Sequence, residues 1–204
     1  LLILSILALE SAHSIRFLYH HFLSGITKKS LNVFYYACSY AKVDYSNFMN
    51  ITARTALKLI PDPLKTHPVF LCVDDTMVSK FGKKFENVSK LFDHATHNGS
   101  NYLNGHCFVS IMLCVPVLDH DKISYLSVPL GYRMWQKKES KLELAASMIR
   151  QVMPEFLSKE HVIILCDSWY TKKNLVSIID EYPNLDLIGN ARIDSVMYDL
   201  APER

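Results

Sequence analysis

The sequence lacks the features that define several large classes of protein. Its five cysteines include no pair at the CxxC spacing of zinc-binding and redox motifs. It also lacks the run of about 20 apolar residues that a membrane span requires, because the apolar opening at residues 1–9 is shorter and no basic residue precedes it as in a signal peptide. We therefore expect a cytoplasmic protein with no membrane partner, in which residues 1–9 form a core helix.

A large excess of charge of one sign is also missing. The net charge is +2, and half of the 204 residues are hydrophobic, which excludes disorder and allows a sizeable core. Residues 1–68 hold seven Lys and Arg against three acids, whereas residues 69–204 hold fifteen against seventeen. Such an imbalance suits an N-terminal part that contacts phosphate and a C-terminal part that concentrates acids for metal, although it also arises by chance.

The first third of the chain has helical periodicity. Helices are predicted over residues 14–23, 30–41 and 44–60, with Ser30 and Asp44 as N-caps and a break at Gly25. Three prolines between residues 61 and 68 then prevent helix continuation. We predict an N-terminal helical region over residues 1–66, where DNA contact is one option, and a second domain over residues 67–204.

Strand signals dominate after residue 68. Strands are predicted at residues 69–75, 86–96, 105–118, 161–167 and 185–189, with 124–132 extending the sheet, and helices at 139–153 and 170–181. A polar turn at residues 97–100 predicts a hairpin of the second and third strands. The order of strands and helices is that of the ribonuclease H fold, so the predicted class is α/β, a ribonuclease H-like mixed sheet flanked by helices.

Two aspartates close two of these apolar strands. Asp75 ends the strand at residues 69–75, and Asp167 ends the strand at residues 161–167. A carboxylate is costly to bury unless a positive group meets it, and in the ribonuclease H order these strands are parallel neighbours. Taken singly, each acid is best explained as the cap of a turn, but together they predict a shared divalent cation site.

Five motifs then follow one another at characteristic spacings. They are Val-Asp-Asp-Thr with Gly-Lys-Lys at residues 73–84, Phe-Asp-His at 92–94, Gly-His at 105–106, Cys-Asp-Ser-Trp-Tyr at 166–170, and Leu-Ile-Gly-Asn-Ala-Arg-Ile-Asp at 187–194. In sequence, order and spacing they resemble insertion-sequence transposases of the DDE superfamily. The resemblance is strong from about residue 69 to residue 200 and weak in the N-terminal helices.

The resemblance implies a nuclease and strand-transfer enzyme with three carboxylates and two divalent ions, Mg²⁺ or Mn²⁺. Asp75 and Asp167 match the first two catalytic and metal-binding carboxylates, with Asp75 bridging both ions and Asp167 holding one. Asp74 points to the opposite face of its strand and occupies a position where relatives can carry Glu. The third carboxylate is a Glu beyond Arg204. We therefore expect the chain to be a fragment or a truncated gene product, and inactive alone.

The implied partner is double-stranded DNA, both transposon ends and target, in a prokaryotic cytoplasm at the nucleoid. A homodimer in the DNA complex is one arrangement that the resemblance allows. A catalytically inactive remnant that acts only in DNA binding or assembly is the alternative. A different ribonuclease H-like nuclease is a third hypothesis.

Several residues are candidates for DNA contact. Lys80, Lys83, Lys84 and Lys90 follow the first strand, although a solvated charged face explains them equally well. Trp169 and Tyr170 could stack on a base or flank the site, but packing of the following helix is favoured.

Three further groups carry weaker signals. Lys137, Lys138 and Lys141 have the same two explanations as the lysines above. The helices around Gly25 have a minor alternative as a helix-turn-helix with Lys28 and Lys29. The histidines at positions 94, 97 and 106 are explained most simply by a polar hairpin.

Overall fold

The computed structural model describes residues 1–9, 14–82, 85–92, 102–156, 160–191, 193 and 195. The chain forms two compact units, Leu1–Asp44 and Tyr45–Arg204. Helix α5 (Tyr45–Leu57) contacts strand β4 of the sheet and so belongs to the second unit. The domain boundary after residue 66 stays a prediction.

The first unit is helical. Its elements are α1 (Leu2–Ala8), α2 (Ile15–Leu18), the π-helical turn η1 (Tyr19–Leu23), α3 (Ser24–Ile26) and α4 (Leu31–Tyr40). Leu18, Leu23 and Phe34 form its buried core. The predicted break at Gly25 is wrong by two residues, because helical backbone continues to Ile26 and becomes extended at Thr27.

The apolar helix at the start of the chain forms, and Leu2 and Leu9 pack against the core of the first unit, but most of its apolar residues are exposed, so the predicted core helix is only partly confirmed. Ser5 is the residue of α1 that is buried, and its hydroxyl donates to the carbonyl of Leu2. Ile3 and Leu7 are exposed. No helix in the described parts of the chain is long and apolar enough to cross a membrane.

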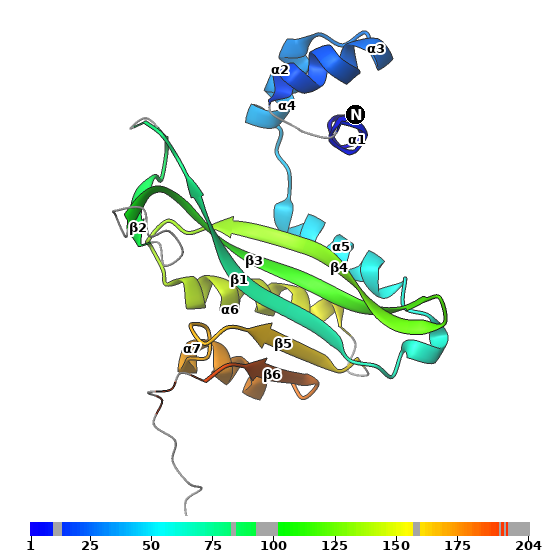
Figure 1. Ribbon diagram of the computed structural model, residues 1–204, viewed down its shortest axis with the longest axis vertical. Coiled ribbons are helices and arrows are strands. Elements are labelled where there is room, and N and C mark those ends of the chain that lie inside the picture. Colours follow the sequence, from blue (N-terminus) through cyan, green and yellow to red (C-terminus); the bar gives the residue numbers. More distant parts are fainter. Residues whose placement is uncertain are drawn as a thin grey trace, which may run out of the picture. The chain divides into compact units, whose positions relative to one another are not determined.

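The second unit is built on a mixed sheet. Its strands are β1 (Val69–Ser79), β2 (Ser89–Phe92), β3 (Tyr102–Asp119), β4 (Lys122–Met134), β5 (Val162–Cys166) and β6 (Leu185–Gly189). The strand order is β2-β3-β1-β5-β6, with β4 also paired to β3. β1 is antiparallel to β3 and parallel to β5, and β5 is parallel to β6. This confirms the predicted ribonuclease H-like α/β class and makes β1 and β5 neighbours (Figure 1).

The main hairpin differs from the predicted one. β3 and β4 are joined by His120 and Asp121, whose φ angles of 46° and 61° lie in the left-handed region that two-residue hairpin turns require. The predicted strand at residues 86–96 contains the short β2, which is antiparallel to the beginning of β3. The predicted turn at residues 97–100 lies outside the described residues.

One face of the sheet is covered by helices. These are α5, α6 (Lys141–Val152), α7 (Lys173–Val176) and the 3-10 segment η4 (Ser177–Glu181), with shorter 3-10 turns η2 (Asp62–Leu64) and η3 (Met153–Glu155). The predicted helix at 170–181 is thus a short α-helix followed by a 3-10 segment. Their apolar residues share one core with the alternate β1 residues Val69, Leu71 and Val73.

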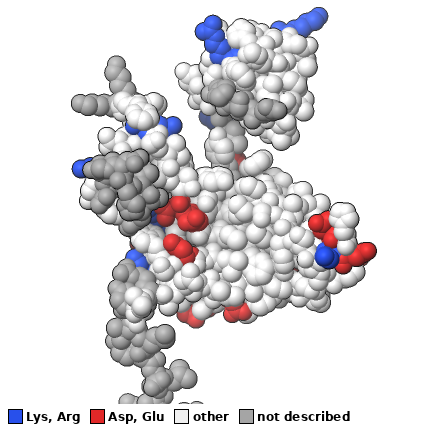
Figure 2. Space-filling view, viewed as in Figure 1, with Lys and Arg blue, Asp and Glu red and all other residues white. Residues whose placement is uncertain are grey.

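The opposite face of the sheet is turned toward the viewer in Figure 1. It presents the half-exposed alternate residues of β1, such as Phe70 and Cys72. Figure 2 shows the surface of the second unit from the same side. Much of this surface is uncharged, and its acidic atoms lie in a few separate groups.

Candidate active site

Asp75 lies inside β1. The prediction that it ends the strand is wrong, because antiparallel pairing with β3 continues as far as Ser79 opposite Gly105. Gly105 permits this extension, since a Cβ at that position would lie 2.3 Å from the carbonyl oxygen of Val78. Strand alternation places Asp74 on the exposed side, whereas Asp75 is partly buried.

Three side chains from distant parts of the chain contact the carboxylate of Asp75. The Lys141 ammonium donates to Oδ2 at 2.7 Å, and the Cys107 thiol donates to the same oxygen at 3.2 Å. The Tyr170 hydroxyl donates to Oδ1 at 3.3 Å. The side chains of Lys141 and Asp75 are each only 17% exposed, so this ion pair is shielded from water far more than a surface pair.

Asp167 is held in a different way. It directly follows β5 and is exposed, and its Oδ1 accepts the backbone N–H groups of Trp169 at 3.0 Å and Tyr170 at 3.3 Å. This is the turn-capping geometry that short acidic side chains favour after a strand. Capping the turn leaves the carboxylate next to the cavity described below.

Both aspartates line one cavity of about 570 Å³. The register of the parallel pair explains this, since Val73 is opposite Cys166 and both carboxylates follow shortly after. The remaining charged and aromatic residues of the lining are Lys90, Phe92, Trp135, Lys137, Lys141 and Trp169. The cavity therefore combines two carboxylates with a rim of lysines and aromatic rings.

The chemistry around Asp75 is reflected in shifted pKa values. Burial lowers the pKa of Lys141, but the hydrogen bond and charge of Asp75 outweigh it, so that the pKa is raised overall. Burial, followed by the Asp75 charge and hydrogen bond, also raises the pKa of Tyr170. Burial and then Asp75 raise the pKa of Cys107 to about 11. Lys141 is thus a cation at neutral pH, while Tyr170 and Cys107 keep their protons and donate.

Local structure fixes Lys141 in place. It is the first residue of α6 and lies within a capping box, in which the Ser140 hydroxyl accepts from the Glu143 N–H while the Glu143 carboxylate accepts from the Ser140 N–H. The preceding segment is held by Trp135, whose Nε1 donates to the Glu139 carbonyl at 2.7 Å.

The residues predicted to contact DNA fall into different environments. Trp169 lines the cavity, whereas Lys80 is half-buried with its ammonium 5.7 Å from the centre of the Phe85 ring and is not part of the lining. Lys83 and Lys84 lie outside the described residues. The expectation that Tyr170 stacks on a base is wrong, because the side chain is fully buried and leaves no ring face for a base, but its hydroxyl flanks the site by donating to Asp75. Packing, the favoured explanation of this residue, is what the structure has.

The structure describes one of the three histidines that were predicted to belong to a hairpin. His106 is buried in β3, and its Nε2 lies 2.8 Å from the carbonyl oxygen of Glu86. The histidines at positions 94 and 97 lie outside the described residues.

The donor set of the cavity suits a hard divalent cation. Asp75 and Asp167 offer carboxylate oxygens, the ligands that Mg²⁺ prefers. The ammonium of Lys141, 2.7 Å from Asp75, shows that this carboxylate already attracts a positive charge. In the described parts of the chain no group of three or more His, Cys, Asp or Glu gathers around a single point, so the two aspartates form a partial site.

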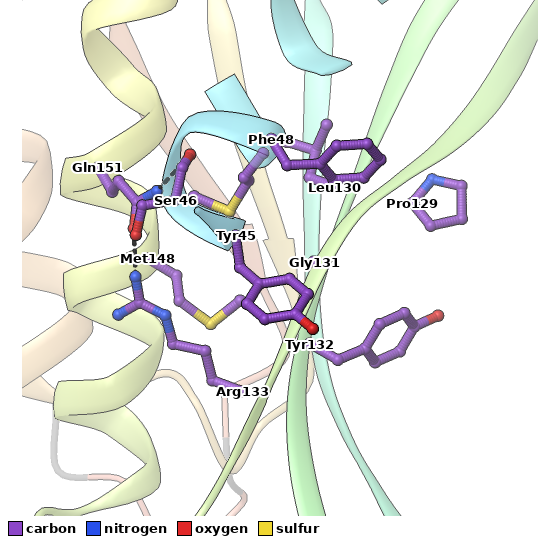
Figure 3. Close-up of a pocket in the computed structure, with 11 residues that line it drawn as sticks. Tyr45, Ser46, Phe48, Pro129, Leu130, Gly131, Tyr132, Arg133, Met148 and Gln151 are labelled. Atoms are coloured by element: carbon purple, nitrogen blue, oxygen red, sulfur yellow. Dashed lines mark hydrogen bonds between the residues drawn. The ribbon is translucent and has the colours of Figure 1, made fainter. Parts of the chain in front are cut away.

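A second cavity, of about 370 Å³, lies between α5, β4 and α6 (Figure 3). Its lining contains no carboxylate and so offers no acidic ligand for a cation. Arg133 of β4 donates to the Ser147 hydroxyl at 3.0 Å and to the side-chain oxygen of Gln151, and Gln151 donates to the Ser46 carbonyl at 2.9 Å. These bonds fix α6, and with it Lys141, against the sheet.

The family model described as DDE superfamily endonuclease matches residues 37–204. The chain belongs to this family.

Two solved structures of Mos1 transposase are also similar. For the Mos1 strand transfer complex the identity is 12% and the TM-score 0.30, over 94% of this chain and 58% of that one. For the Mos1 paired-end complex with the left transposon end the values are 10% and 0.31, over 93% and 57%. The chain thus spans somewhat over half the length of these transposases. No curated protein matches.

Sequence reasoning missed part of the constellation around Asp75. Lys141 was grouped with two neighbouring lysines, and Trp135 and Cys107 were not considered for the site. The pattern Ser140-Lys-Leu-Glu143 is a capping-box signature that places Lys141 at the start of a helix. No local signal identifies Asp75 as its partner, because the two residues are 66 positions apart.

Proposed function

We propose that this chain carries the catalytic core of a metal-dependent DNA transposase that cleaves and joins DNA strands at transposon ends. The observation that supports it most is that Asp75 and Asp167, from parallel neighbouring strands, line one cavity. Membership of the DDE endonuclease family supports the reaction class.

In this proposal Asp75 and Asp167 hold divalent ions, Mg²⁺ or Mn²⁺. When bound, such ions activate an attacking oxygen and stabilise the leaving oxygen of a phosphodiester. The chain's own groups orient the carboxylates: the amides of the turn hold Asp167, and Tyr170 and Cys107 donate to Asp75. A third carboxylate, which the resemblance to DDE transposases implies, would complete the site.

Lysines at the rim suit the phosphates of double-stranded DNA. Lys90 and Lys137 line the cavity, with their ammonium groups 4.5 Å from the Tyr102 ring centre and 5.9 Å from the Trp135 ring centre. Trp169 lies beside Asp167 and offers an aromatic surface to the DNA. The proposal also includes the DNA contacts predicted for Lys80, Lys83 and Lys84. It further includes an origin of the chain in an insertion-sequence element of a prokaryotic cell.

Metal binding tests the carboxylates directly. Calorimetric titration of Mg²⁺ or Mn²⁺ should give heat with the unchanged chain and lose most of it with Asp75→Ala or Asp167→Ala. Asp74→Ala is the matched control, because it removes the same charge one residue away on the opposite face of β1. Metal binding that gives the same heat in all four proteins would contradict the assignment.

DNA binding tests the rim. Fluorescence anisotropy with a labelled duplex should show weaker binding by a Lys90→Ala, Lys137→Ala double variant. The slope of the salt dependence should fall by about one for each phosphate that the variant no longer neutralises. Lys122→Ala, in the distant turn end of β4, is the control. Light scattering of the complex would show whether two copies of the chain bind together.

The alternative is a remnant that binds DNA or assembles without cutting. The observation in its favour is that only two carboxylates meet in the described part of the site. Incubation of the chain with plasmid DNA and Mn²⁺ separates the two functions. Cleavage that is lost with Asp75→Ala supports the enzyme, whereas DNA binding without cleavage in the chain extended beyond residue 204 supports the remnant.

A further inference from the structure

The ammonium of Lys141 is held beside Asp75 by contacts on several sides. Its Nζ is 2.7 Å from Oδ2, and it lies 5.5 Å from the ring centre of Trp135 and 5.3 Å from that of Trp169. Indole faces attract ammonium ions, so a carboxylate and two rings together hold this cation. The capping box of α6 fixes the backbone from which it extends.

This position conflicts with a metal ion on the same carboxylate. A magnesium ion binds a carboxylate oxygen at about 2.0–2.1 Å, so an ion on Oδ2 and an ammonium 2.7 Å from that oxygen would stand within a few ångströms of each other. Repulsion between charges at such a distance is strong even with protein and solvent screening. The second oxygen, Oδ1, is the acceptor of the Tyr170 hydroxyl.

We propose that Lys141 is a built-in competitor for divalent cations at Asp75, which holds this carboxylate in the cation-free protein and leaves it when a cation binds. The inference rests on the proposed metal site and adds a regulatory residue to it. Lys141 sets the concentration of cation at which the site fills, and its departure frees an ammonium inside the cavity that the DNA is proposed to enter.

The two tryptophans provide a signal for this exchange. Trp135 and Trp169 are the only tryptophans of the chain, and both rings face the Lys141 ammonium. Addition of Mg²⁺, which does not itself quench indole, should change the tryptophan emission of the unchanged chain as the ammonium moves away. Saturating Mg²⁺ that binds by calorimetry and leaves the emission unchanged would overturn the proposal without any substitution.

Substitution tests the competition itself. Lys141→Met keeps the length of the side chain and removes its charge, and it should bind Mg²⁺ at least about tenfold more tightly than the unchanged chain. Lys138→Met is the matched control, since this exposed lysine removes the same charge three residues earlier and does not line the cavity. Its affinity should stay within about twofold of the original.

The outcomes separate the two proposals. In one outcome, Lys141→Met binds Mg²⁺ no more tightly than the unchanged chain, and Asp75→Ala does not bind it. This outcome overturns the role of Lys141 as a competitor and keeps the metal site. Absence of Mg²⁺ binding in every protein, Lys141→Met included, overturns both. Binding that appears only when Lys141 is replaced supports both.

Discussion

The surroundings of Asp75 and of Asp167 show two ways to place a carboxylate in one cavity. Asp167 is held by amides of its own turn, two and three residues ahead. Asp75 is held by Cys107, Lys141 and Tyr170, which reach it from β3, α6 and the turn after β5. The geometry of the first is therefore local, whereas that of the second exists only when the second unit is folded. The following substitutions test this difference.

The largest expected effect comes from Gly189→Ala, which disturbs the turn of Asp167. A Cβ at Gly189 would lie 2.4 Å from Thr171 Cγ2 and 3.0 Å from Cys166 Sγ. Such overpacking should lower the free energy of unfolding by about 3 kcal/mol, measured by urea denaturation. Gly25→Ala has nothing within 4 Å of the new methyl group and should be neutral or slightly stabilising. A similar small effect at both positions would show that the turn is not tightly packed.

Lys141→Met should be next, because it leaves Asp75 with neutral partners. We expect a loss of about 2 kcal/mol of unfolding free energy, less than for a fully buried pair. The folded pKa of Lys141 is above its ordinary value of 10.5, so the stabilisation is complete below that pH and disappears as the pH rises through the folded value.

A double-mutant cycle isolates this pair. Combined with Asp75→Asn, the Lys141→Met substitution should cost much less than it does alone. If the two effects simply add, the ion pair contributes nothing and Asp75 is held by its other partners.

Asp167→Ala should have a smaller effect on stability. It removes the acceptor of two turn amides, which costs about 1 kcal/mol by analogy with helix N-caps. Asp167→Asn keeps an acceptor oxygen and should recover most of this loss. If the Asn variant is as unstable as the Ala variant, the negative charge rather than the local hydrogen bonds stabilises the turn.

Tyr170→Phe should have the smallest effect of the four. It removes one hydroxyl that donates to Asp75 at 3.3 Å and keeps the buried ring, so thermal unfolding should show a loss of about 0.5–1 kcal/mol. Tyr170→Ala, which also empties part of the core, should cost several times more. Equal losses for the two variants would mean that the ring contributes little to the core.

The sequence predicted the local part of this comparison better than the long-range part. Asp167 follows a short apolar strand and precedes a turn, and both features are readable from adjacent residues. The neighbourhood of β1 and β5 was also predictable, because it depends on the order of strands and helices. The prediction that Asp75 ends its strand was wrong, because the length of β1 is set by its pairing with β3 and not by its own apolar run.

The partners of Asp75 were not predictable from the sequence. A lysine at the start of a helix can face solvent, phosphate or a carboxylate, and only the packing of α6 on the sheet decides between them. The β3–β4 turn was a different kind of error. Its polar residues Asp119-His-Asp-Lys122 separate two apolar runs, a hairpin signal that was present but was not used.

The attachment of Lys141 to α6 also connects the ion pair to the far end of that helix. A helix of 12 residues is a stiff rod about 18 Å long, and its last turn is fixed to β4 and α5 through Gln151. An axial displacement of about 1 Å at Gln151 would carry to the other end and stretch the 2.7 Å contact with Asp75 beyond hydrogen-bonding range. The packing around Gln151 thus sets the position of a charge in the cavity that Asp75 and Asp167 line, a full helix length away.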